Sequence, residues 1–191
     1  MKTTILLLLT AGLAPSAMTV YEVGPAGQSV MELTVEKTGL LGGKKHLFNF
    51  AAYKGTLSLD RKDPEKSTIA ISIASASISC RDTWLSAKDL RKVQDYALKE
   101  MLAANRYPEI EFRSTAIKKV ASGGFEVEGT LTLRGVSRPA IVAAVLQAGV
   151  IEGTSRVRLT DYGLKPPTAA LGAIGTKNEM LFRFVIPLAA E

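Results

Sequence analysis

The stretch ANRYPEIEFRST, residues 104–115, changes its periodicity in the middle. The residues before Pro108 have helical spacing, and apolar and polar residues alternate after it. Ile110, Phe112 and Ala116 share one parity, the pattern of a strand with one buried face. A proline cannot continue a helix and biases the residue before it towards extended geometry, so Pro108 predicts a change from helix to strand.

The segment before this change, SAKDLRKVQDYALKEML (residues 86–102), predicts one amphipathic helix. Ser86 and Asp89 are spaced as an N-terminal cap, and Asn105 and Pro108 end the helix. Apolar residues recur along it at helical spacing: Leu90, Val93, Ala97, Leu98, Met101 and Leu102.

Most of the remaining chain alternates with period two, which predicts roughly eight strands separated by turn signals. Gly55 interrupts one alternating run, and Leu57 and Leu59 resume it with the opposite parity, as at a bulge or bend. The runs are residues 30–37, 46–60, 67–79, 109–116, 124–136, 138–148, 153–163 and 178–188. The expected fold is all-β with one helix, an antiparallel sandwich or barrel.

Residues 1–17, MKTTILLLLTAGLAPSA, have the layout of a secretory signal peptide. Lys2 precedes an apolar run well short of the roughly 20 residues that cross a membrane. We expect cleavage near Ser16 or Ala17 and a mature domain, residues 18–191, in the periplasm or outside the cell.

Composition narrows the class of partner. Cys80 is the only cysteine, so no internal disulfide forms and the core alone holds the fold. The net charge of +6 is spread along the chain, and no aromatic-interleaved basic motif points to nucleic acid. We expect a monomer or a homodimer, with transient contact to a membrane surface as a further option.

Few residues suggest catalysis. His46 is the only histidine, which excludes a histidine-rich metal site, and no G-x-S-x-G sequence presents a serine. A hydrolase would need Cys80 with His46, but Cys80 ends an apolar strand, where a buried structural thiol is the common case. We expect no catalytic residue, no metal and no cofactor.

Two features have both a functional and a purely structural interpretation. His46 follows a glycine-rich turn, GLLGGKKH (39–46), and either contacts a polar head group or bonds nearby backbone. The helix either covers a barrel end or is a movable lid over an apolar cavity. Basic residues on it could attract an anionic head group, although acidic neighbours dilute them: Lys88, Arg91, Lys92 and Lys99.

Two motifs, YPEIEFRST (107–115) and GTLTLRGVSRP (129–139), resemble the YceI-like family, the polyisoprenoid-binding-type lipid carriers of the bacterial periplasm. The segment 37–60 looks like the family's glycine-punctuated strands, and TDYGLKP (160–166) resembles its late aromatic-glycine turn. Commoner members have a histidine shortly before the glycine turn, where Lys37 or Thr38 stands here. The likeness spans roughly residues 19–188.

The resemblance implies an eight-stranded, lipocalin-like antiparallel barrel that sequesters or transports one long isoprenoid or fatty amphiphile. With strand parity and the helix, it suggests the following lumen residues: Phe48, Phe50, Ile71, Ile73, Leu98, Met101, Ile110, Phe112, Val127, Leu131, Leu133, Phe182 and Phe184. His46 is the candidate head-group contact. Two alternatives stay open: a packed barrel that acts as an interaction or stress protein, and a lipid-modifying enzyme using His46 or Cys80.

Overall fold

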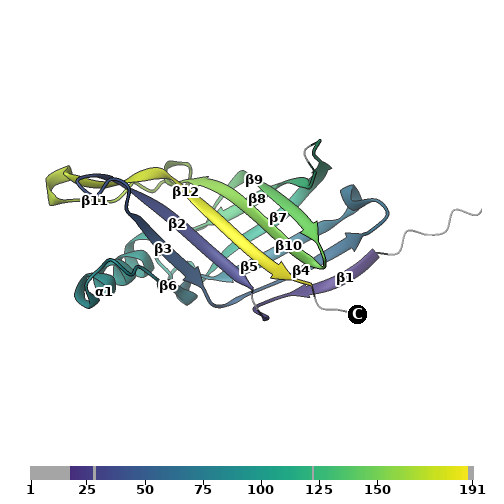
Figure 1. The fold of residues 1–191 in the computed structure, drawn as a ribbon, viewed down its shortest axis with the longest axis horizontal. Helices are drawn as coiled ribbons and strands as arrows, with labels where there is room; N and C mark the ends of the chain where they lie inside the picture. Colours follow the sequence, from purple (N-terminus) through teal and green to yellow (C-terminus); the bar gives the residue numbers. More distant parts are fainter. Residues whose placement is uncertain (1–17, 28, 122, 189–191) are drawn as a thin grey trace, which may run out of the picture.

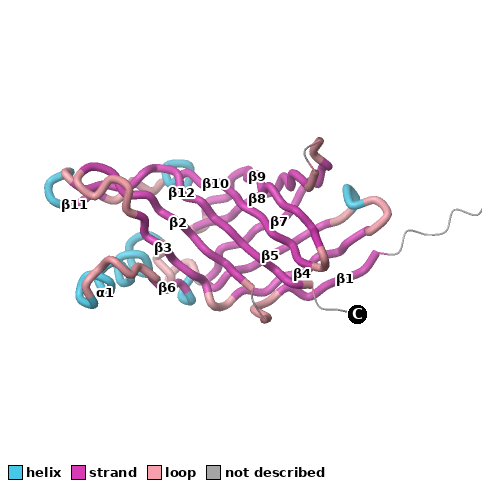
Figure 2. The backbone as a smooth tube through the Cα atoms, in the orientation of Figure 1, coloured by secondary structure: helices cyan, strands magenta, loops and turns pink. Residues whose placement is uncertain are grey.

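The computed structural model describes residues 18–27, 29–121 and 123–188. The signal peptide predicted at residues 1–17 lies outside the described residues. Strands make up most of the described chain, and the helical segments are short (Figure 2). Within these ranges no helix is both long and apolar enough to cross a membrane.

The elements follow one another as the periodicity predicts, with one α-helix between the sixth and seventh strands. The strands are β1 (Met18–Val23), β2 (Val30–Gly39), β3 (Lys45–Phe50), β4 (Tyr53–Asp60), β5 (Thr68–Ala74), β6 (Ile78–Cys80), β7 (Glu109–Lys119), β8 (Phe125–Leu133), β9 (Val136–Gln147), β10 (Val150–Arg158), β11 (Thr168–Ala169) and β12 (Ile174–Pro187). The helix is α1 (Ala87–Tyr96), which a wider π-helical turn (Ala97–Met101) extends.

The strands form one antiparallel sheet that curls into a barrel-like shape (Figure 1). Their order is β1-β4-β5-β7-β8-β9-β10-β12-β2-β3-β6, and β11 pairs with β12. β3 and β4 are the two halves of one strand that is kinked at residues 51–52. Because β3 pairs with β2 and β4 pairs with β5, this kinked strand connects the two ends of the strand order. The kink and the short β1, β6 and β11 raise the count from the predicted eight to twelve.

The change of parity between Phe50 and Leu57 is real, but it occurs at the kink and not at Gly55. Ala51 N bonds Ser77 O at 3.2 Å and Ala52 O accepts from Ala74 N at 3.0 Å, so the hairpin stays paired on both sides of the corner. Gly55 instead allows β4 to approach β5 closely, because a Cβ at this position would lie 2.3 Å from Ala70 O.

The opening stretch behaves as predicted up to Ser114. β7 begins directly after Pro108, and Ile110 and Phe112 face inwards. The expectation that Ala116 shares their face is wrong, because the register between β7 and β8 shifts between Ser114 and Ala116. Such a bulge adds one residue and reverses the parity, so Ile117 becomes the buried residue.

The helix begins where its cap predicts. Ser86 Oγ accepts a hydrogen bond from Asp89 N at 3.1 Å, the N-terminal capping contact. α1 lies beside β6 at one end of the barrel (Figure 1). Its described residues include none that is fully buried, but Ala97 and Leu102 in the following turn are. The helix therefore covers this end of the barrel and leaves its polar side in solvent.

Candidate ligand-binding site

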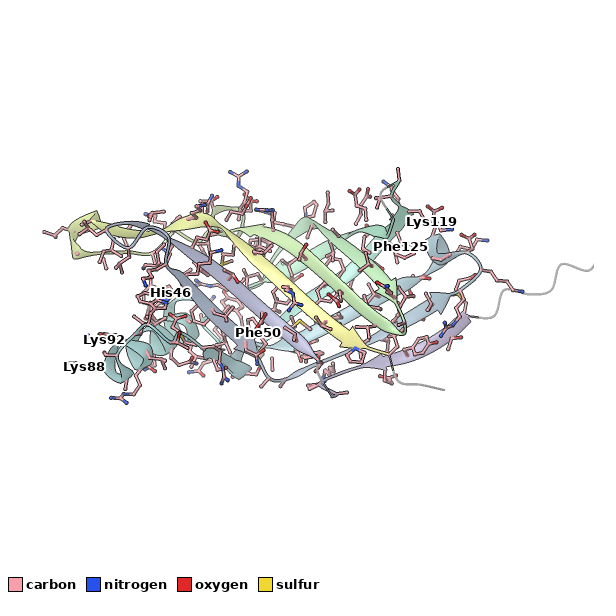
Figure 3. The ribbon with its side chains drawn as sticks, viewed as in Figure 1. His46, Phe50, Lys88, Lys92, Lys119 and Phe125 are labelled. Carbon is pink, nitrogen blue, oxygen red and sulfur yellow. The ribbon has the colours of Figure 1, made fainter. Side chains whose placement is uncertain are left out.

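The inner faces of the strands surround an apolar cavity, here called the lumen cavity, with a volume of about 180 Å³. Figure 3 shows Phe50 near the middle of the barrel and Phe125 towards the end remote from α1. Most of the predicted lumen residues line this cavity: Phe50, Ile71, Ile73, Ile110, Phe112, Val127, Leu131, Leu133, Phe182 and Phe184.

The lumen cavity offers almost no polar group to a ligand. Among the described residues that line it, Glu111 carries the single charge, and Ser67 and Ser155 carry the hydroxyl groups. Both hydroxyls have partners already, since Ser67 Oγ accepts from Asp60 N at 2.9 Å and Ser155 Oγ donates to Ile141 O at 2.8 Å. The surface of this cavity therefore suits hydrocarbon.

Two glycines give the aromatic rings of the lumen their space. A Cβ on Gly153 would lie 2.3 Å from Phe184 Cζ, and a Cβ on Gly129 would lie 2.5 Å from Phe112 Cζ. Each ring thus lies across a glycine of a neighbouring strand, an arrangement known as aromatic rescue. Any larger residue at these positions would force the ring to move.

A second cavity, here called the mouth cavity, lies at the α1 end and has a volume of about 310 Å³. The helix, β2, β3 and the loop before β12 line it, and it contains the predicted residues Phe48, Met101 and Leu133. Leu98 lines neither cavity and packs against the core. Four side chains line both cavities and so lie between them: Leu33, Leu102, Leu133 and Met180.

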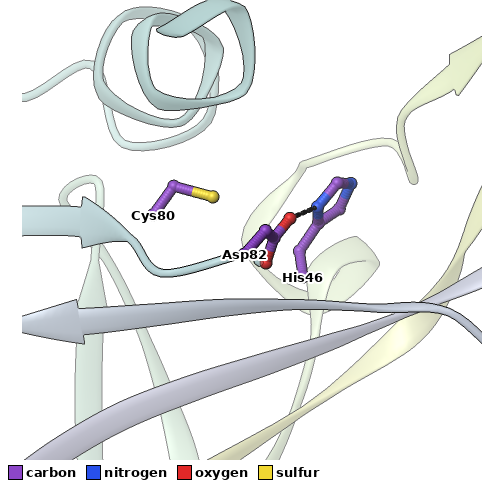
Figure 4. Close-up of side chains that lie close together, drawn as sticks. All are labelled: His46, Cys80 and Asp82. Atoms are coloured by element: carbon purple, nitrogen blue, oxygen red, sulfur yellow. Dashed lines mark hydrogen bonds and ion pairs between the residues drawn. The ribbon is translucent and has the colours of Figure 1, made fainter. Parts of the chain in front are cut away.

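His46 lines the mouth cavity from β3 and is held by Asp82 (Figure 4). Its Nδ1 lies 2.5 Å from Asp82 Oδ2, while Asp82 Oδ1 accepts from Leu47 N at 2.8 Å. A carboxylate only accepts hydrogen bonds, so the ring donates its Nδ1–H. Trp84 stacks on the ring with a centroid separation of 5.4 Å. Nε2 is left without a hydrogen-bond partner among the described residues.

Cys80 does not form the nucleophile–base pair that a hydrolase requires. Asp82 lies between the Cys80 thiol and the His46 ring, and Nε2 points away from the sulfur (Figure 4). Burial raises the pKa of the Cys80 thiol above its ordinary value of 9.0, which disfavours the reactive thiolate. The geometry therefore gives no support to the alternative of a cysteine-dependent enzyme.

His46, Cys80 and Asp82 also form the one group of potential metal ligands found within the described chain, with ligand atoms within 4.8 Å of one another. All three are buried. Both oxygens of Asp82 already accept hydrogen bonds, from the ring and from Leu47 N. A cation would have to displace the Nδ1 proton, so the group as it stands is a hydrogen-bonded structural cluster.

Lys37 and Thr176 also line the mouth cavity. In the sequence, Lys37 stands out only as a departure from the family's histidine, and neither residue is assigned to a site. Lys37 continues the inward parity of Met31, Leu33 and Val35 on β2, and this signal was available in the sequence. Thr176 follows the irregular loop before the central part of β12, where no periodicity predicted its neighbours.

A curled antiparallel barrel with a carbon-lined cavity and a polar mouth defines the class of lipocalin-like binding barrels. The sequence model of the YceI-like domain matches residues 21–186, and the chain belongs to this family.

Relatives and solved structures agree with this assignment. A UPF0312 protein of Pseudomonas putida W619 is 30% identical over 173 residues, covering 85% of this chain and 84% of the relative. One of Pseudomonas syringae pv. tomato is 33% identical over 133 residues, 62% of this chain and 63% of its own length.

Burkholderia cenocepacia BcnA superposes with a TM-score of 0.63 at 16% identity, covering 85% of this chain and 97% of BcnA. The Campylobacter jejuni YceI protein gives a TM-score of 0.56 at 18% identity, covering 75% of this chain and 85% of the YceI protein. At these identities the likeness establishes the fold. Family and fold together support a binding-protein kind of function.

Proposed function

We propose that the protein is an exported carrier that sequesters or transports a long-chain isoprenoid or fatty amphiphile, with the hydrocarbon in the lumen cavity. The observation that carries the proposal is the composition of that cavity: apolar side chains surround it, and both its hydroxyls are already bonded. The packed-barrel alternative requires interdigitated side chains there, which leaves no room for a ligand.

The two cavities limit how a long chain fits. A cavity of about 150 Å³ holds one benzene molecule, so the lumen cavity alone accommodates a short hydrocarbon segment. A long chain therefore has to pass from the mouth cavity into the lumen cavity, and Leu102 and Met180 must turn aside. Met180 suits this role because an unbranched thioether side chain adopts many rotamers.

Hydrocarbon alone supplies enough binding energy. Drug-sized ligands contribute roughly 0.3 kcal/mol per heavy atom, so a chain of about 40 carbons contributes roughly 12 kcal/mol, near nanomolar affinity. A chain of about 20 carbons contributes roughly half as much. Affinity is therefore expected to rise with chain length until both cavities are full.

We further propose that the cargo enters at the α1 end while this end touches a membrane. Leu40 and Leu171 are 79% and 110% exposed. They lie on adjacent loops, and Leu40 N donates a hydrogen bond to Ala173 O at 3.0 Å between these loops. Lys44 and Lys165 lie near them in sequence and form no ion pair with a carboxylate of the described residues. Exposed leucines beside lysines that have no carboxylate partner suit the surface of an anionic bilayer.

Native mass spectrometry of mature protein purified without detergent tests the carrier proposal. We expect one long-chain species per protein, released by organic extraction. If the purified protein carries no ligand and also takes up no added polyprenyl or fatty ligand, the result would favour the packed interaction domain. A His46→Ala variant separates the enzymatic alternative, because a carrier keeps the binding of hydrocarbon in the lumen cavity, which His46 does not line, whereas an enzyme dependent on His46 loses turnover.

A further inference from the structure

The polar end of an amphiphile needs a place, and the lumen cavity does not provide one. Its hydroxyls have partners, and its one charge is the acidic Glu111. The mouth cavity is different, because lysine, histidine and threonine side chains line it together with apolar ones.

Lys37 is one of the two lysines that line the mouth cavity. It lies on the inward parity of β2, is partly buried, and forms no ion pair with a carboxylate in the described part of the chain. Burial lowers the pKa of Lys37 below its ordinary value of 10.5, and the charge of Asp82 opposes part of this effect. A partly desolvated cation without an ionic partner is stabilised by an incoming anion.

Thr176 on β12 adds an independent observation. Its Oγ1 is buried and has no hydrogen-bond partner in the structure. Because β12 pairs with β2, Thr176 lies opposite Lys37 in the register. A buried hydroxyl without a partner costs free energy unless a ligand satisfies it. The two side chains lie on neighbouring strands and line one cavity.

None of the carboxylates described around the mouth is left free to repel an anion. His46 turns its Nε2 away from Asp82 (Figure 4), and in the neutral ring, which donates through Nδ1, this nitrogen is an acceptor. Lys92 of α1 also lines the cavity. Both oxygens of Asp82 are occupied, and Asp89 is bound to Lys92 at 3.1 Å. On β2, Glu36 pairs with Lys45 and Lys177.

We propose that the mouth cavity binds an oxyanion head group, a phosphate monoester or a carboxylate, through Lys37 and Thr176, with Lys92 in the same cavity lining. This rests on the proposed carrier function and adds the chemistry of the polar end. A neutral alcohol would leave the Lys37 ammonium unpaired, and a cationic head group would meet two lysines.

Three ligands with the same chain test the proposal: dodecyl phosphate, dodecanoate and dodecanol, each titrated below its critical micelle concentration by fluorescence displacement. We expect both anions to bind the wild-type protein about ten- to a hundred-fold more tightly than the alcohol, the range of a charge-assisted hydrogen bond. Equal affinities for all three would overturn the oxyanion site. Failure of all three to bind, together with failure to take up an added polyprenyl chain, would instead remove the carrier function itself.

Lys37→Met tests the anchor, and Lys88→Met is the matched control. Lys88 is an exposed lysine of α1 that does not line the mouth cavity, so its loss changes the net charge equally. We expect Lys37→Met to remove the preference for the anions and to leave the affinity for dodecanol unchanged. An equal fall in affinity for all three ligands would show that Lys37 has a structural role and would contradict its assignment as the anchor. A larger loss for dodecyl phosphate than for dodecanoate would identify the phosphate as the head group.

Thr176→Val keeps the shape of the side chain and removes the hydroxyl. We expect it to keep or raise the stability of the empty protein, because the lost group has no partner there, and to weaken binding of the anions several-fold. A destabilised protein with unchanged anion affinity would show that Oγ1 serves the fold and not the ligand.

Discussion

Gln94 of α1 pairs with the backbone at Cys80 as a neighbouring strand would. Its side-chain oxygen accepts from Cys80 N at 2.6 Å, and its nitrogen donates to Ile78 O at 2.6 Å. One amide thus satisfies both backbone groups on the open edge of β6. This contact, together with the apolar turn after the helix, holds α1 over the mouth cavity.

Replacing Gln94 with Ala is expected to loosen the helix from the edge of β6. Losing the partner of a buried backbone group costs about 1–3 kcal/mol, so the urea midpoint should fall and amide exchange in residues 87–101 should accelerate. Gln94→Glu is the matched comparison, because it keeps the acceptor for Cys80 N and loses the donor to Ile78 O. Unchanged exchange in both variants would mean that apolar packing alone holds the helix.

A methyl group at Gly153 should reduce the lumen cavity. Because Phe184 Cζ would lie 2.3 Å from the new Cβ, we expect Gly153→Ala to push the ring into the lumen, to cost about 1–3 kcal/mol of stability and to weaken long-chain ligands more than short ones. Gly24→Ala is the control, since its Cβ would meet nothing nearer than 3.7 Å. Equal ligand affinities in the two variants would count against a ligand in the lumen.

The buried thiol of Cys80 gives a test based on pH. Its pKa is raised by burial, so the folded protein keeps a proton that the unfolded chain releases above its ordinary value of 9.0. The resulting stabilisation is complete below that pH and is lost as pH rises towards the folded pKa. We expect the difference in unfolding free energy between wild type and Cys80→Ala to shrink from about pH 8 to about pH 10.

Reactivity provides the second readout for Cys80. Ellman's reagent should find no reactive thiol in the native protein at about pH 8 and one per chain in denaturant. Rapid labelling of the native protein would contradict the buried position.

Membrane contact at the mouth should depend on the two exposed leucines. We expect a Leu40→Ser, Leu171→Ser double variant to lose most of its sedimentation with anionic vesicles and to fold normally, because both side chains lie in solvent. Ile141→Ser is the control, as Ile141 is 57% exposed but lies on β9, outside these loops. Vesicle binding that is unchanged in the double variant, or a dimer that the variant disrupts, would reject membrane contact through these loops.

The sequence by itself determined the local features of this protein. Alternation of apolar and polar residues placed most strands. It also predicted that the side chains of Phe182 and Leu131 face inwards, because side-chain direction in a strand depends only on parity. Ser86 and Pro108 marked the start of the helix and of the following strand, since capping and proline geometry act over a few residues. The two family motifs indicated a barrel.

The tertiary structure alone decided what lies far apart in sequence and close in space. The bulge after Ser114 and the kink at residues 51–52 depend on how neighbouring strands align, which parity within one strand does not reveal. The meeting of Lys37 with Thr176, like the pairing of Gln94 with Cys80, depends on the register between strands and on where the curled sheet brings the helix. Distances across a fold depend on the packing of the whole chain, so only the folded structure fixes the chemistry of the mouth.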